Sequence, residues 1–445
     1  MSPGPVSAAI AAHRFGLGEP TLAPLAGDPV GWLLAQIGPA DVQRGSALPD
    51  TATALAQHAA YVQQRREARQ APADERSTDA GVAEHFRTLV QADTRARLAT
   101  ASATTRPFAE RLALFWANHF TVSQAKGSVR GLVGAFEREA IRPHIVGRFE
   151  TLLGAAVRHP AMLRYLDNER SAGPDARLAQ RPKRSNRGTG LNENLAREVL
   201  ELHTLGVGGG YTQADVTALA AVLTGWRAEG FVPGWHQPGP KTVLGRVYAE
   251  GPEALQAVLH DLARHPATAR FITTKLARHV VADEPPATLV DRLVVAWQRS
   301  DGDLGAVTTA LVQAPEAWAT APLKLKSPEE FVLASARVLA LGDSAWARQP
   351  DGGIGTLGQR VQAAPSPAGW PDRAAEWLGP DAVWKRVEWA HRVGERLGGR
   401  VDARAVAAAS LGPWLSDGTR QEIQRAADGA QALALLLLAP EFQRR

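Results

Sequence analysis

The segment Asn192–Trp226 has the sequence NENLAREVLELHTLGVGGGYTQADVTALAAVLTGW and contains the pattern that decides the fold. In its first half, leucine and valine recur at spacings of three and four, which is the period of one helix face. A glycine run follows, and Thr212 with Asp215 then forms a start resembling a capping box. The segment therefore predicts two helices joined by a glycine turn, with Gly206 ending the first helix in a left-handed conformation.

The same helical period continues on both sides of this segment. Apolar spacings of three and four recur in Arg106–Phe120, Gly131–Leu153 and Pro285–Trp297, while only Lys241–Val247 suggests a short extended segment. No run of about 18 apolar residues is present, so no membrane span is expected. We predict an all-α fold, a single compact multi-helical domain over residues 1–445 with irregular loop insertions and at most a minor short β element.

Two internal repeats support a helical architecture. Arg158–Ala161 and Arg264–Ala267 share the motif RHPA, and each is expected to open a helix with proline in its first turn. Asp303–Trp318 resembles Asp428–Gln443, since both end in Ala-Pro-Glu followed by an aromatic residue. Segments rich in Gly, Pro, Ser or charge predict mobile insertions at 70–81, 172–190 and 349–371.

Composition excludes several functional classes. The chain has no cysteine, which excludes disulfides, thiolate nucleophiles and cysteine-ligated metal sites. Its formal charge of +5 is spread evenly apart from Arg181–Arg187, which is either a solvated loop or a contact for an anionic ligand. Nucleic acid is therefore an unlikely partner. The N-terminus lacks a basic n-region, so no signal peptide is evident, and the compartment stays open between periplasm and cytoplasm.

Glu198 is the anomaly of the first helix, because the helical wheel places it between Leu191 and Leu205 on the apolar face. A carboxylate there must be paired, bound to a cation or protonated. Glu198 is thus either half of a structural ion pair with an arginine or a catalytic or metal-binding group. Glu201 lies three residues on, and Glu193, Arg197 and Glu201 also fit a surface salt ladder.

Other polar residues of the chain complete the candidate site. The catalytic candidates are Glu198, Glu201, Asp167 and His203, although His203 alone also suits a helix-end histidine. A divalent metal is a possible cofactor, with His119, His203, His236 and Glu198 as candidate ligands brought together from separate segments, since no HExxH motif is present. The candidate substrate-binding residues are Asn118, Asn168, Asn194, Tyr211, Trp226 and Lys241.

A series of motifs in fixed order resembles the bacterial domain-of-unknown-function 1800 family. The motifs are HRFGLG at 13–18, FWANHF at 115–120, LDN at 166–168, NENLARE at 192–198, ELHTLG at 201–206, GGYT at 209–212, LTGW at 223–226 and KTVLG at 241–245. The resemblance implies one mostly helical unit. It also implies export, although this chain shows no clear signal peptide. Members of the family are often encoded beside a sulfatase-like family, which suggests a sulfatase-like partner protein and a role with envelope or extracellular polymers.

Two functional hypotheses follow. The first is a hydrolase that uses buried carboxylates, glycosidase-like or metal-dependent, with an envelope or extracellular glycan as its candidate substrate. The second is a non-catalytic helical scaffold that binds an envelope enzyme or a polysaccharide, for which Trp226, Trp235 and Trp370 are candidate exposed rings. The scaffold hypothesis predicts that Glu198 pairs with an arginine. The enzyme hypothesis predicts that Glu198 shares a pocket with at least one of His119, His203 and His236.

Overall fold

The computed structural model describes residues 4–45, 48–70, 80–180, 190–321 and 324–445. Helices make up 62% of it and its strands form two short antiparallel pairs, so the fold is mostly α, as predicted. The pairs are β1 (Trp226–Arg227) with β2 (Gly230–Phe231) and β3 (Lys241–Val243) with β4 (Arg246–Tyr248). The second pair confirms the extended segment predicted from Lys241 onward.

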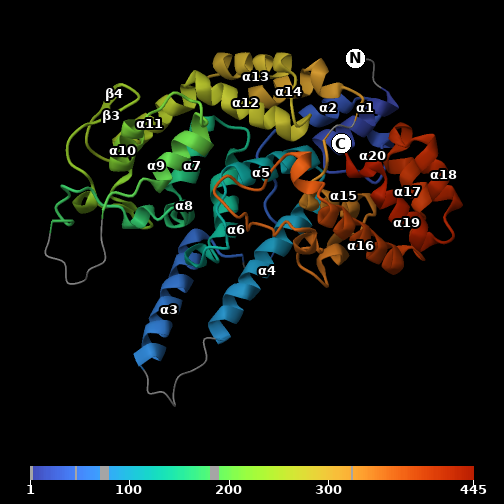
Figure 1. Ribbon diagram of the computed structural model, residues 1–445, viewed down its shortest axis with the longest axis horizontal. Coiled ribbons are helices and arrows are strands. Elements are labelled where there is room, and N and C mark those ends of the chain that lie inside the picture. Colours follow the sequence, from blue (N-terminus) through green and yellow to red (C-terminus); the bar gives the residue numbers. More distant parts are fainter. Residues whose placement is uncertain (1–3, 46–47, 71–79, 181–189, 322–323) are drawn as a thin grey trace.

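Figure 1 shows the helices in chain order. The α-helices up to the β pairs are α1 (Pro5–Ile10), α2 (Pro29–Leu34), α3 (Thr51–Gln70), α4 (Ala80–Ala103), α5 (Pro107–His119), α6 (Val133–Phe136), α7 (Phe149–Arg158), α8 (Pro160–Tyr165), α9 (Asn194–Glu198) and α10 (Gln213–Leu223). Those after them are α11 (Glu253–Arg264), α12 (Pro266–Val280), α13 (Ala287–Arg299), α14 (Leu304–Gln313), α15 (Pro328–Val338), α16 (Pro380–Leu397), α17 (Ala403–Ser410), α18 (Asp417–Arg425), α19 (Gly429–Leu438) and α20 (Pro440–Gln443).

Thirteen shorter helical turns complete the described fold. Three are π-helical: η1 (Ala11–Phe15), η4 (Glu137–Ile141) and η7 (Val199–Thr204). The others are 3₁₀ turns: η2 (Ala23–Leu25), η3 (Gly127–Val129), η5 (Arg142–His144), η6 (Asn168–Arg170), η8 (Pro233–Trp235), η9 (Pro315–Trp318), η10 (Gly342–Trp346), η11 (Ile354–Leu357), η12 (Ala374–Trp377) and η13 (Gly412–Trp414).

Helix α5 is the centre of the arrangement, and it corresponds to the helix predicted over Arg106–Phe120. Nearly every side chain along it is buried. All three π-helical turns contribute contacts to it: Arg111 donates to the carbonyls of Phe15 and Gly16 beside η1, Glu110 pairs with Arg142 next to η4, and His119 contacts the carbonyl of His203 in η7. Because π-turns insert an extra residue into a helix and recur at functional sites, they direct attention to the surroundings of α5.

Two apolar cores flank α5. The larger core takes its side chains from residues 8 to 318, and the second is built mainly by α15 to α20 with additions from α4. In Figure 1 the elements of the first core lie to the left and top, those of the second to the right, and α3 and α4 project below. Polar side chains that lie where the two sets of helices meet can therefore come from distant parts of the sequence.

The local sequence signals explain how several helices begin. His159 and His265 of the two RHPA motifs are N-caps, each accepting a hydrogen bond from the N–H two residues ahead, with proline opening α8 and α12 as predicted. Asp303 and Asp428 cap α14 and α19, so the second repeat is also a repeated helical unit. The expected helix over Gly131–Leu153 is interrupted instead. It ends at η5, where a proline at position 143 removes a backbone donor.

The predicted insertions have different outcomes. Residues 71–79 and 181–189, which include the basic cluster, lie outside the described residues. Segment 349–371 is described, and it forms part of the wall of a polar pocket beside α5. Within the described ranges no helix combines the length and apolar character needed to cross a bilayer.

Candidate functional site

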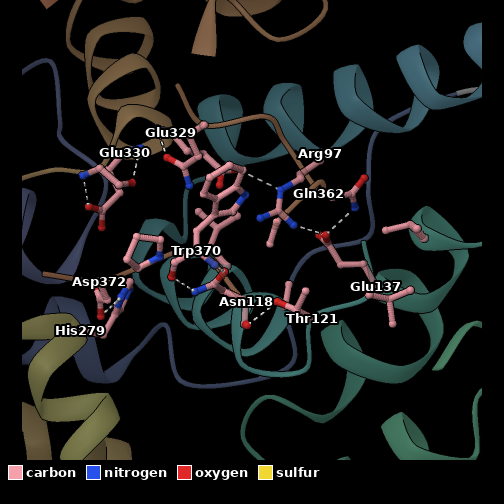
Figure 2. Close-up of a pocket in the computed structure, with 18 of the residues that line it drawn as sticks. Arg97, Asn118, Thr121, Glu137, His279, Glu329, Glu330, Gln362, Trp370 and Asp372 are labelled. Atoms are coloured by element: carbon pink, nitrogen blue, oxygen red, sulfur yellow. Dashed lines mark hydrogen bonds and ion pairs between the residues drawn. The ribbon is translucent and has the colours of Figure 1, made fainter. Parts of the chain in front are cut away.

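A polar pocket lies between α5, the last turn of α12, the first turn of α15 and segment 359–372 (Figure 2). The space that atoms do not fill there is about 830 Å³, part of it open to solvent. Figure 2 shows Trp370 between a His279–Asp372 pair on one side and an Arg97–Glu137 pair on the other. The pocket thus combines an aromatic ring with charged and amide side chains, as sites for polar ligands do.

Three carboxylates of the pocket are held by arginines. Arg97 pairs with both Glu137 and Glu329, in the second case at 2.9 Å, and Glu330 pairs with Arg111 and with Arg445 at 2.6 Å. Burial alone would raise the pKa of Glu330, but the two arginines outweigh it and hold that pKa well below 4.5. Burial would also raise the pKa of Glu137, but Arg97, Arg142 and Gln362 together outweigh it and lower that pKa. Glu137 and Glu330 are therefore ionised structural anchors at neutral pH.

The His279–Asp372 pair differs from these anchors. His279 Nδ1 lies 3.1 Å from Asp372 Oδ2, while its buried Nε2 has no hydrogen-bond partner among the residues that the structure describes. Burial lowers the pKa of His279, and Asp372 acts against that shift. Burial would raise the pKa of Asp372, but His279 and Lys324 outweigh it and lower the pKa. At neutral pH the pair is therefore a carboxylate beside a neutral imidazole whose Nε2 can accept a proton.

Asn118 fixes Trp370 in the pocket. Its side-chain amide donates to the carbonyl of Trp370 at 2.9 Å, and its side-chain oxygen accepts from the N–H of Trp370 at 2.8 Å. Gly369 permits this contact, because its φ is +85° and a Cβ there would lie 2.5 Å from the carbonyl oxygen of Asn118. Asn118, a predicted substrate-binding residue, thus lines the pocket and also orients its aromatic ring.

His119 and His203 lie side by side, with ring centroids 6.1 Å apart. His119 Nε2 contacts the carbonyl oxygen of His203 at 3.3 Å and its Nδ1 contacts Lys275 Nζ at 3.1 Å. Burial, with Lys275, lowers the pKa of His203 to about 3. Neither ring nitrogen of His203 has a partner in the described part of the chain. The predicted helix-end histidine is therefore a buried neutral ring whose backbone holds His119.

The carboxylates of Asn192–Trp226 form a separate cluster. Arg197 pairs with Glu193 at 3.2 Å, and Glu201 accepts a hydrogen bond from the Tyr211 hydroxyl at 3.3 Å. Glu198 is partly buried and has no ion pair or hydrogen bond with any described residue. Burial and then Glu201 raise the pKa of Glu198. Of the predicted salt ladder, the Glu193–Arg197 pair is thus present. The arginine partner that the scaffold hypothesis requires for Glu198 is absent from the described residues.

The glycine turn and the second helix agree with the sequence prediction. Gly206 has φ +82°, and the capping box between Thr212 and Asp215 is formed at the start of α10. A Cβ at position 206 would lie 2.7 Å from the Phe271 ring, so glycine is required there by both conformation and space. The turn therefore joins α9 and η7 to α10 and lies against α12.

The remaining candidate residues serve mainly as local ties. Asp167 pairs with Lys126 at 2.7 Å, and buried Asn168 donates to the carbonyls of Leu223 and Trp226. Four candidates remain. His236 contacts Thr224 and Lys241, itself a candidate, through its two ring nitrogens. Trp226 packs on Phe231, and Asn194 is exposed. No three acidic or histidine side chains in the described ranges are grouped so as to hold a metal ion.

Sequence reasoning missed His279, Asp372 and Lys275. His279 lies near the end of a helix in an unremarkable ARHV segment, and Asp372 comes directly after the segment 349–371 that was predicted to be mobile. The only signal was Trp370 itself, an aromatic residue between glycine and proline. Pairing over 93 residues, as between His279 and Asp372, leaves no local pattern to detect.

Comparison with known proteins gives one match. The model of a family described as "Protein of unknown function (DUF1800)" matches residues 10–444. It confirms the resemblance drawn from the motifs, and it adds no named activity. Searches of curated proteins and of solved structures found no match.

Proposed function

The chain belongs to this family of unknown function, since the match covers nearly all of it, and on that premise we propose that it is a hydrolase acting in the pocket beside Trp370. The reaction is the cleavage of an ester bond carried by a polar polymer, such as an acylated envelope glycan. The His279–Asp372 pair carries the proposal, because it places an oriented imidazole on the wall of a pocket and leaves its buried Nε2 without a partner among the described residues.

The chemistry follows from the orientation of the imidazole. Asp372 accepts the Nδ1 proton of His279, so Nε2 carries the lone pair. His279 Nε2 takes a proton from a water molecule while the water oxygen attacks the carbonyl carbon of the ester. The same ring then returns the proton to the leaving alkoxide as the C–O bond breaks, which yields a carboxylic acid and an alcohol. One histidine thus acts as base and then as acid.

The pocket supports ester cleavage better than a two-carboxylate glycosidase mechanism. A glycosidase needs one carboxylic acid held protonated beside an ionised one. In the pocket, arginines lower the pKa of both Glu137 and Glu330, so neither carries a proton near neutral pH. Trp370 and Gln362 offer a ring face and an amide that suit sugar units of the polymer.

The test compares the wild-type protein with His279→Gln. We expect acetate release from O-acetylated polysaccharides by the wild type, and a rate lower by about 10²- to 10⁴-fold in the variant. The matched control is His391→Gln, because His391 is an exposed histidine on α16 and should not affect the rate. Circular dichroism checks that both variants fold. An unchanged rate in His279→Gln would contradict the proposal.

The pH profile provides a second check. Burial lowers the pKa of His279 below 6.5, so its base form predominates at pH 7. The acid limb of the rate should therefore have its midpoint below pH 6.5, as His279 becomes protonated. A rate that already falls between pH 8 and pH 7 would indicate a base with a raised pKa and would exclude His279.

A second candidate centre for hydrolysis is the Glu198–Glu201 pair. One observation favours it: Glu198 has a raised pKa and no partner among the described residues, while Glu201 is held by Tyr211. A carboxylic acid with a raised pKa beside a second, ionised carboxylate is the arrangement that glycosidic cleavage requires. Substitution of Glu198 distinguishes the two centres, as set out below.

A further inference from the structure

A second compartment lies next to the pocket. Asn118, His279, Trp370 and Asp372 line both parts. The second compartment adds Lys275 and Arg278, which lie on the same helix as His279. Residues three and four positions apart share one face of a helix, so α12 presents two cations and the proposed base to the same space.

The ammonium group of Lys275 lacks a carboxylate partner. Its contact is with His119 Nδ1, and because His119 Nε2 must donate to the carbonyl of His203, Nδ1 is the acceptor in a neutral ring. No carboxylate of the described residues lies within ion-pair distance of Lys275, which instead lies 5.5 Å from the Phe271 ring centroid. Burial lowers its pKa to about 8, with Asp372 acting against the shift and Arg278 adding to it.

Arg278 is also left without an acidic partner. Its Nε donates to the carbonyl oxygen of Asp283 at 2.9 Å, and its guanidinium makes no ion pair with a described residue. Arg373 in the same compartment is different, since it pairs with Glu284 at 2.9 Å. Asp372 is engaged by His279 and Lys324. Exposed Glu376 also lines the compartment and makes no ion pair with a described residue. Lys275 and Arg278 therefore have no carboxylate of the described chain within ion-pair distance.

We propose that this compartment binds an anionic group of the substrate, a carboxylate or a phosphate, through Lys275 and Arg278. The proposal deepens the proposed function and rests on it: the substrate is an acidic polymer whose charged unit sits in the second compartment while the neighbouring ester lies at His279. Lysine and arginine together are the usual protein partners of such oxyanions. Binding there supplies the counter-charge that Lys275 and Arg278 lack.

Titration calorimetry of the full chain tests this with D-glucuronate, glucose 6-phosphate and glucose. Loss of one charge-assisted contact should weaken binding about tenfold or more, so both acidic sugars should bind at least that much more tightly than glucose. Lys275→Met should reduce this preference about tenfold, because Arg278 remains, and Lys275→Arg should restore it in part. Lys385→Met is the control, because Lys385 is on the exposed face of α16 and pairs with Asp381. The relative affinities for D-glucuronate and glucose 6-phosphate show whether the site prefers a carboxylate or a phosphate.

Equal affinity for glucose and the acidic sugars, or full affinity in Lys275→Met, would overturn the inference. If Lys275→Met does not fold, Arg278→Gln decides, since unchanged affinity for the acidic sugars in that variant would overturn the inference too. Failure of the hydrolase proposal looks different: acidic sugars would bind, while His279→Gln would leave polymer cleavage unaffected. Cleavage of a neutral polymer that depends on His279, with no preference for acidic sugars, would overturn the anion site alone.

Discussion

The pocket and the Asn192–Trp226 segment contain similar charged side chains, but they pair them over different sequence separations. In the pocket, Glu330 pairs with Arg111 and Arg445, at separations of 219 and 115 residues. In the segment, Arg197 pairs with Glu193 four residues away and Glu201 with Tyr211 ten residues away. A helical wheel detects only short separations, so the segment was visible in the sequence and the pocket was not.

The ion pairs of the pocket and of the segment should also stabilise the fold to different extents. The largest expected effect comes from substitution of Glu330. Glu330→Gln leaves Arg111 and Arg445 buried without their carboxylate, so we expect a loss of about 3–5 kcal/mol in the free energy of unfolding. The matched variant in the segment is Glu193→Gln, where loss of a partly exposed i,i+4 pair should cost about 0.5 kcal/mol or less. Urea unfolding of both variants measures the difference, and equal losses would refute it.

The pH dependence of stability sharpens this prediction. Because the pKa of Glu330 in the folded chain is well below 4.5, its contribution is complete above pH 4.5 and is lost as the pH falls further. The free energy of unfolding should therefore decrease below pH 4.5 in the wild type, and less steeply in Glu330→Gln. Parallel curves for the two proteins would show that Glu330 is not held by its arginines.

An intermediate loss of stability is expected when the hydrogen bonds between Asn118 and Trp370 are removed. Asn118→Ala removes two hydrogen bonds to the backbone of Trp370, which should cost about 1–3 kcal/mol of stability and raise KM for the polymer. The control is Asn194→Ala in the segment, because that side chain is exposed. Tryptophan fluorescence reports whether the Trp370 ring becomes mobile. An unchanged KM in Asn118→Ala would show that substrate binding does not depend on the orientation of Trp370.

How far the sequence predicts this molecule depends on the range of the interactions. Helix α5, the RHPA helix starts and the capping box at Thr212 were predictable, because each is set by residues within one or two helical turns. The π-turn η7 was not, and it rotates His203 from the predicted shoulder of the helix into the buried interior. His279 and Asp372 meet only once α12 and segment 359–372 are packed against α5, and no periodicity records that contact.

The smallest expected effect, on Glu198, decides between the two candidate centres. A raised carboxyl pKa means that the folded state favours the protonated form, so at pH 7 the ionised Glu198 opposes folding. Glu198→Gln should therefore raise the melting temperature slightly at pH 7, and the gain should vanish below pH 4.5, where the wild type is protonated in either state. Glu201→Gln, which loses the Tyr211 contact, should show no such gain.

If the pocket is the active centre, Glu198→Gln also keeps the wild-type rate of ester cleavage. A folded Glu198→Gln protein as inactive as His279→Gln would move the centre to Asn192–Trp226, because a residue that destabilises the fold and is required for the reaction is retained for its chemistry.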